Sequence, residues 1–132
     1  MTRLNIKTFA IAAFTAAALA MSSSASAGDE TIASGTFVGK SNHVTSGTVS
    51  VVKTDSGTKV VLESDFDFDG APDPKLGFGK NGYDKSSQFS VLKANKGEQS
   101  YEIPASINPE NYNEVWVWCE QYSVPLGVAK LK

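Results

Sequence analysis

The stretch TVSVVKTDSGTKVVL, residues 48–62, predicts a β-hairpin and with it the class of the fold. Two valine-rich runs flank a polar link, and Asp55-Ser56-Gly57 in that link is typical of a tight turn between antiparallel strands. Successive side chains on a strand point to opposite faces, so each run places alternate apolar residues on one side. The side chains predicted to share the buried face are Val49, Val51, Val60 and Leu62.

Similar short runs recur along the rest of the chain, separated by turn-forming residues. Further strands are predicted at residues 35–39, 64–70, 75–79, 88–93, 100–104, 114–120 and 122–131. Residues 105–113 are irregular, with room for one helical turn, and no stretch after residue 27 keeps a helical period over three turns. Strands at this spacing predict an all-β fold, either a sandwich or a jelly-roll or barrel-like domain of about eight short antiparallel strands.

Residues 1–27 have the features of a secretory signal peptide. Arg3 and Lys7 precede an apolar stretch, Thr8 to Ala20, that is short for a membrane span. An Ala-x-Ala pattern then predicts cleavage after Ala27. A permanent N-terminal anchor is the alternative, which the short apolar stretch disfavours. We therefore expect an exported protein, periplasmic or extracellular, with one domain at residues 28–132 and no membrane span after cleavage.

The charge of the expected domain limits its partners. Residues 28–132 hold ten basic and fourteen acidic side chains, a net charge of −4, and contain no arginine. Nucleic acids and phosphate-rich molecules favour arginine forks and basic patches. Nucleic acid is therefore not expected as a partner.

Cys119 is the one cysteine in the sequence. It ends a predicted strand in which Val115, Val117 and Cys119 share one face, while Trp116 and Trp118 share the other. An odd cysteine in an oxidising compartment is buried, paired with another molecule or reactive. A small buried hydrophobe, a disulfide-linked dimer and a redox thiol all remain open.

Composition removes several redox centres. His43 is the only histidine, so the two histidines and one cysteine of a blue-copper site are not available. A single cysteine also excludes four-cysteine zinc or iron–sulfur sites and a C-x-x-C dithiol. What survives is a bare thiol, or a group held by few protein ligands, such as haem bound by Cys119 with His43 opposite.

Three ordered blocks resemble the electron-transfer DM-thirteen domain family, over about Gly35 to Leu131. The blocks are the C-terminal YNEVWVWCEQYSVPLGVAKL, the motif Gly-x-Gln-x-Tyr-x-x-Pro at residues 97–104, and His-Val-x-Ser-Gly at residues 43–47. The resemblance implies an all-β domain whose characteristic cysteine corresponds to Cys119. It also implies electron transfer or oxidative modification of extracellular proteins, through the bare thiol or a bound haem.

Two departures from the family pattern matter for this expectation. Family members often accompany DOMON domains and transmembrane cytochromes, and this chain carries neither, so a redox partner is expected to be a separate molecule. The chain also has Ala71-Pro72-Asp73-Pro74, where the family more usually has Gly-Pro-Asp and an aliphatic residue.

The acidic stretch DFDFDGAPDP, residues 65–74, is a second candidate site. Asp65, Asp67, Asp69 and Asp73 occupy ligand positions of a calcium loop. The twelfth position is Leu76, however, where the loop motif requires a bidentate glutamate. The alternative is a strand with its phenylalanines inward and its aspartates outward.

An extracellular binding module without redox chemistry is the alternative function. Trp116, Trp118 and Tyr122 offer rings for stacking a sugar or a protein chain, unless they fill core space instead. Neither a hydrolytic triad nor a specific carboxylate pair can be assigned, so no hydrolase activity is predicted.

Overall fold

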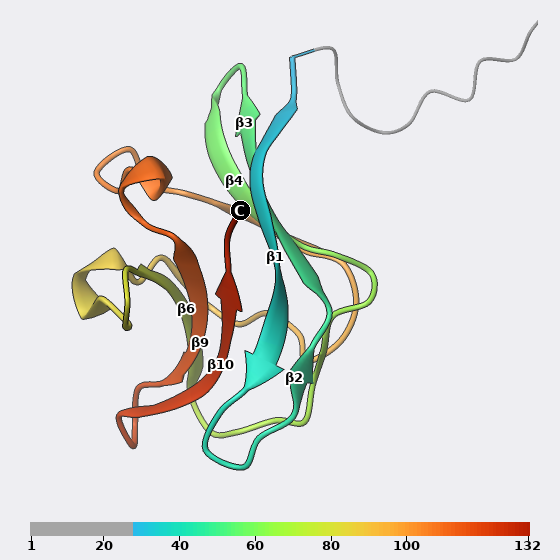
Figure 1. The fold of residues 1–132 in the computed structure, drawn as a ribbon, viewed down its shortest axis with the longest axis vertical. Coiled ribbons are helices and arrows are strands. Elements are labelled where there is room, and N and C mark those ends of the chain that lie inside the picture. The colour runs from blue at the N-terminus through green and yellow to red at the C-terminus, as the bar shows by residue number, and fades with distance from the viewer. Residues whose placement is uncertain (1–27) are drawn as a thin grey trace, which may run out of the picture.

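The computed structural model describes residues 28–132, so the predicted signal peptide and its cleavage site at Ala27 lie outside the described residues. The described chain contains β-strands and two single-turn 3₁₀ helices, which confirms the all-β prediction (Figure 1). The strands are β1 Glu30–Gly39, β2 Thr45–Ser46, β3 Thr48–Thr54, β4 Gly57–Leu62, β5 Asp67–Phe68, β6 Pro74–Gly79, β7 Ser90–Val91, β8 Gln99–Glu102, β9 Glu114–Cys119 and β10 Val124–Lys130, and the 3₁₀ helices are η1 Lys85–Ser87 and η2 Pro109–Asn111. Within residues 28–132, no helix is both long and apolar enough to cross a membrane.

Eight strands form one antiparallel sheet in the order β7-β6-β9-β10-β1-β3-β4-β8, and β2 and β5 pair separately. The sheet curls into a nearly closed barrel, in agreement with the barrel-like alternative. Strand β1 joins its two halves, because residues 30–36 pair with β3 and residues 37–39 pair with β10. In Figure 1, β1, β3 and β4 therefore lie on one side and β6, β9 and β10 on the other.

The hairpin predicted from residues 48–62 forms β3 and β4. Thr54 pairs with Gly57, so the turn consists of Asp55 and Ser56. The four apolar side chains predicted for the buried face are at most 1 % exposed. The local pattern thus predicted both the turn and the buried face.

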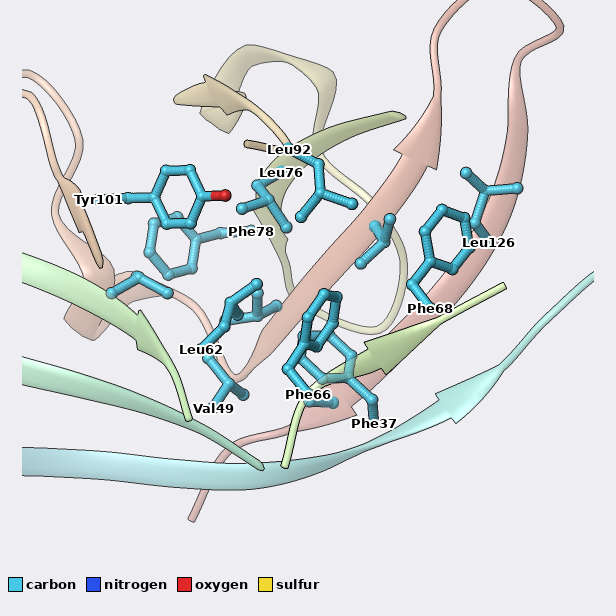
Figure 2. Packing of buried hydrophobic residues seen from close by; sticks show 14 of the residues in the cluster. Phe37, Val49, Leu62, Phe66, Phe68, Leu76, Phe78, Leu92, Tyr101 and Leu126 are labelled. Carbon is cyan, nitrogen blue, oxygen red and sulfur yellow. The ribbon is translucent and has the colours of Figure 1, made fainter. Parts of the chain in front are cut away.

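The core fills the space between the two halves of the barrel, as Figure 2 shows. Phe66 and Phe68 are 1 % exposed, and they come from the acidic stretch. The phenylalanines of this stretch point inward, as the strand interpretation requires, although only Asp67 and Phe68 form strand β5. Phe78 and Leu76 of β6 face them from the opposite half.

The gap between β7 and β8 is closed by side chains, and we call this region the seam. Gln99 Nε2 donates to the Ala94 carbonyl at 2.9 Å, and Gln99 Oε1 accepts from the Ala94 N–H at 3.1 Å. The Tyr101 hydroxyl accepts from the Lys93 N–H at 2.9 Å and donates to Gln99 Oε1. Residues 97–104, one of the three quoted blocks, thus supply the residues that close the barrel.

Several predicted strands differ in extent from the structure, such as residues 35–39, which form the second half of the longer β1. Residues 88–93 contribute only the two-residue strand β7, because Phe89 N–H and Leu92 N–H bond to carbonyls of β6 outside a regular ladder. Pro74 begins β6 rather than only ending the preceding strand. Proline is tolerated there because it is the first residue of the strand, and its carbonyl still accepts from the Leu92 N–H at 2.9 Å.

Candidate functional site

Cys119 lies at the end of β9 with its side chain in the barrel interior. Val115 and Val117 are fully buried on the same face, and Cys119 is 1 % exposed, which confirms the predicted division of the strand into two faces. Its Sγ donates to the carbonyl oxygen of Pro72 at 3.0 Å. The thiol is therefore a hydrogen-bonded group of the core.

The segment that covers Cys119 is the turn between β5 and β6, residues 69–73. Gly70 and Asp73 both adopt left-handed backbone conformations, with φ of 98° and 55°. The Asp73 carbonyl accepts from the Glu120 N–H at 3.3 Å, which ties this turn to the β9–β10 connection. Because Pro72 is exposed, only one layer of chain separates the thiol from the surface.

His43 is attached to the other end of the same turn. Its Nδ1 lies 2.8 Å from Asp69 Oδ1, and the Val44 N–H donates to Asp69 Oδ2 at 3.0 Å. The fold thus brings His43 and Cys119 to opposite ends of residues 69–73. No hydrogen bond joins His43 to Cys119 in the described part of the chain.

The packing around Cys119 does not fit a haem. Its sulfur has the Pro72 carbonyl as its partner and almost no exposed surface. Three cavities of about 290, 190 and 450 Å³ occur elsewhere on residues 28–132. They are lined mainly by residues of β1, β3, β4 and the segment 103–113, and none of the three touches Cys119 or His43.

The four aspartates of the proposed calcium loop have separate partners. Asp65 accepts from the backbone and hydroxyl of Thr48, Asp67 pairs with Lys96, Asp69 with His43 and Val44, and Asp73 with Lys75. Among residues 28–132, no group of three or more His, Cys, Asp or Glu side chains is arranged to hold a metal ion. Calcium binding therefore stays a prediction, without support from these contacts.

Hydrogen bonds lower the pKa of two of these carboxyls. The pKa of Asp69 lies below its ordinary value of 3.8, chiefly because the Val44 N–H binds the ionised form and then because His43 does. The pKa of Asp65 is lowered by the backbone N–H and then the hydroxyl of Thr48. Through these hydrogen bonds, Asp69 is attached to the segment just before β2 and Asp65 to the start of β3.

We expect the stability of the domain to fall at acid pH through these groups. A carboxyl whose pKa is lowered by folding stabilises the fold fully above its ordinary pKa, and the contribution disappears as the pH falls through the lowered value. Thermal unfolding followed from about pH 6 to about pH 3 should show this loss, and Asp69→Asn should make it shallower. Asp67→Asn is the control, since among residues 28–132 the ion pair of Asp67 is with the exposed Lys96, at 3.6 Å. Equal slopes for wild type and Asp69→Asn would contradict the assignment.

The outer face of β9 carries the two tryptophans, but they do not form an open platform. Trp116 is 9 % exposed, and Trp118 is half-buried beneath Tyr83. The rings of Tyr83 and Trp118 are stacked, with centroids 4.4 Å apart and an angle of 13°. Tyr122 is 61 % exposed in the β9–β10 connection, and no ring contact joins it to either tryptophan in the described chain.

Glycines in β6 make room for this packing. Gly77 pairs with Trp116 across the ladder, and a Cβ on Gly77 would lie 2.7 Å from Tyr83 Cε2. A Cβ on Gly79 would lie 2.5 Å from Trp116 Nε1. The sequence did not identify Tyr83 as part of a site. The sequence feature that could have indicated this packing is the pair of glycines, Gly77 and Gly79, at alternate positions of one strand. They leave one face of that strand without side chains.

Tyr83 lies in a negatively charged environment. The pKa of Tyr83 is raised from 10.0 to about 12, chiefly by burial and then by the negative charges of Glu120 and Asp84. Its hydroxyl donates to Gln88 Oε1 at 3.1 Å. Tyr83 therefore remains a neutral phenol at physiological pH.

Comparison with known proteins gives one match. A family model described as Electron transfer DM13 matches residues 36–131, which include His43, the seam and Cys119. Neither the curated proteins nor the solved structures that were searched contain a match.

Proposed function

The chain belongs to the Electron transfer DM13 family, and we propose that Cys119 is the group through which it exchanges electrons, as a bare thiol, with a separate partner. The family description supports a redox role in general terms. The observation that carries the choice of residue is the position of Sγ, one layer beneath the surface under the Pro72 carbonyl. As the only cysteine in the sequence, Cys119 has no internal disulfide partner.

The proposed reaction is thiol–disulfide exchange. Residues 69–73 move away, and Cys119 loses its proton to water to become a thiolate, the nucleophilic form. The thiolate attacks a disulfide of the partner, so that a bond forms between Cys119 Sγ and one partner sulfur while the partner's S–S bond breaks. The second partner sulfur leaves as a thiolate, and Cys119 is oxidised as that disulfide is reduced. A thiolate from a separate reductant then displaces Cys119 and restores it.

The cover over Cys119 makes this reaction selective. The Cys119 thiol is 1 % exposed and donates to the Pro72 carbonyl, so a partner's disulfide cannot reach its sulfur until the cover opens. The covering turn lies outside the strands, exposes Pro72 and has positive φ at Gly70 and Asp73, so we expect it to open more readily than a central strand. Exchange thus depends on opening of residues 69–73 rather than on random collision at the surface.

The expected export of the protein defines the class of partner. A domain released after cleavage at Ala27 operates in the periplasm or outside the cell, where protein disulfides are abundant. We infer an extracellular or periplasmic protein with an accessible disulfide as the partner.

Mixed-disulfide formation tests the proposal. Incubation of the purified native protein with glutathione disulfide should add one glutathione, seen by mass spectrometry, and Cys119→Ser should add none. Pro72→Gly should accelerate the addition, because glycine loosens the cover, while thermal unfolding checks that each variant folds. A wild-type protein modified only after denaturation would overturn the bare-thiol mechanism.

The visible spectrum and electrophoresis test the alternatives. Protein purified from a haem-replete, oxidising compartment should be colourless. A Soret band that is lost or shifted in Cys119→Ser would instead assign the thiol as a haem ligand. Non-reducing electrophoresis should show monomer, whereas a dimer absent from Cys119→Ser would show that Cys119 pairs between copies.

A further inference from the structure

The outer face of β9 holds three aromatic side chains in one continuous arrangement, which we call the aromatic group: Tyr83, Trp116 and Trp118. Tyr83 stacks on Trp118, and its ring meets Trp116 edge-on with the centroids 6.5 Å apart. Trp116 is nearly buried, and Trp118 is half-buried. The group therefore runs from the interior of this face to the solvent.

A buried carboxylate lies at the inner end of the aromatic group. Glu114 is 6 % exposed, and its Oε1 accepts from Trp116 Nε1 at 3.3 Å and from the Gly82 N–H at 2.8 Å. The indole N–H is a donor only, and an ionised carboxylate is an acceptor only. Buried carboxylates are rare without a paired cation, and neither of these two donors is charged.

We propose that Trp116 is a one-electron redox site, with Glu114 as its proton acceptor and the Tyr83–Trp118 stack as its connection to the surface. The oxidant is a strong one-electron acceptor, such as the ferryl haem of a separate peroxidase. The acceptor takes one electron and is reduced by one unit. Trp116 loses that electron from its indole and its Nε1 proton to Glu114 Oε1. The products are a neutral indolyl radical and a protonated Glu114.

The contact between Trp116 and Glu114 lowers the energy of this step. Loss of an electron makes the indole N–H a much stronger acid, so a carboxylate already bonded to it can take the proton without rearrangement. Proton transfer along an existing hydrogen bond requires a donor and an acceptor in contact. The structure supplies that contact in the resting state.

Negative charge around the Tyr83–Trp118 stack favours the loss of an electron from the stacked rings. Glu120 and Asp84 lie close enough to Tyr83 to raise its pKa, and the same field stabilises positive charge on the adjacent rings. Lys85 lies 3.7 Å from Glu120 Oε1, while Glu120 Oε2 is buried without a hydrogen-bond partner in the described chain. The charge of Glu120 is thus only partly compensated.

This site is separate from the proposed thiol reaction. Trp116 and Cys119 point to opposite faces of β9, and their side chains bond to different partners, Glu114 and the Pro72 carbonyl. The inference therefore goes beyond the proposed function and does not depend on it.

Flash oxidation tests the inference. Tris(bipyridine)ruthenium(III), generated by a laser flash in the presence of a sacrificial acceptor, should oxidise the native protein to a neutral indolyl radical, seen by transient absorption and electron paramagnetic resonance. Trp116→Phe should remove this radical. Glu114→Gln should slow its formation by about tenfold or more, equivalent to about 1.4 kcal/mol in the barrier, and should leave a cation radical. Tyr83→Phe retains the stacked ring and should retain the indolyl signal.

Further measurements keep the test decisive. In deuterium oxide the wild-type step should be slower, since a proton moves with the electron, and this result does not depend on whether Glu114→Gln folds. Cys119→Ser should form the radical as fast as wild type, which separates this site from the thiol. Unchanged radical formation in Trp116→Phe, or the absence of any deuterium effect, would overturn the inference.

Discussion

Replacement of Phe78 by alanine should lower the free energy of unfolding by about 3–5 kcal/mol. Phe78 is fully buried in β6. Its ring packs against Phe89 at 5.1 Å and stacks with Tyr112 at 5.5 Å. Truncation removes the apolar contacts and leaves a cavity that the paired strands on either side of β6 cannot close. Because small domains are stable by about 5–15 kcal/mol, this variant should retain only a small part of its stability.

Urea unfolding followed by tryptophan fluorescence measures this effect. Val38→Ala is a matched control, because Val38 is a β-branched strand residue that is 61 % exposed. We expect that control to change the free energy by at most about 0.5 kcal/mol. A loss below about 1 kcal/mol for Phe78→Ala would show that the core packing around β6 is not as the structure has it.

Replacement of Gln99 by leucine should destabilise the domain by about 2–4 kcal/mol. The amide of Gln99 satisfies both backbone groups of Ala94 and accepts from the Tyr101 hydroxyl. Leucine has similar volume but no polar atoms, so these groups lose their partners at the seam. The largest part of this free-energy cost comes from the Tyr101 hydroxyl, because Tyr101 is 2 % exposed.

Hydrogen exchange should localise that loss to the seam. The Lys93 and Ala94 amides should exchange much faster in Gln99→Leu, while those of the β3–β4 hairpin should change only through the global loss of stability. Ser100→Ala is the control, since the Ser100 side chain is exposed on the same strand. Exchange at Ala94 equal to that of wild type would contradict the role assigned to Gln99.

Local features of the fold could be predicted from the sequence, whereas features that join distant segments could not. The turn at Asp55 and the two faces of β9 follow from alternation within one or two neighbouring strands. The cover of Pro72 over Cys119 joins residues 47 positions apart. Tyr83 likewise reaches Trp118 from a loop that offers no periodic pattern. Such contacts depend on the curvature of the sheet, which no short stretch determines.

In the candidate site, too, local features could be predicted from the sequence and contacts between distant segments could not. The sequence indicated the residue, Cys119, and the strand face that it shares with Val115 and Val117, but gave no sign of its partner. It grouped the aspartates of residues 65–73 as ligands, while the fold gave Asp65, Asp67 and Asp69 partners from other segments, such as Thr48 for Asp65. Glu114 drew no attention, because a glutamate at the start of a strand is ordinary until its burial is known.

The quoted blocks have different roles in the structure. His43 and Val44 of one block hold Asp69, and Gln99 and Tyr101 of another close the seam. Only the C-terminal block contains the thiol. One block therefore holds the turn that covers Cys119, and another closes the barrel.

The side-chain closure between β7 and β8 has a consequence for the behaviour of the protein at high concentration. A sheet that does not close through its backbone leaves two free edges, and a free edge is a template for a strand from another molecule. Here Gln99 and Tyr101 occupy backbone groups of the facing segment, and the Lys93 ammonium donates to the Ser100 carbonyl at 2.6 Å. The seam thus disfavours edge-to-edge aggregation, because the backbone groups beside the gap are already bonded and are not free to pair with a strand of another molecule.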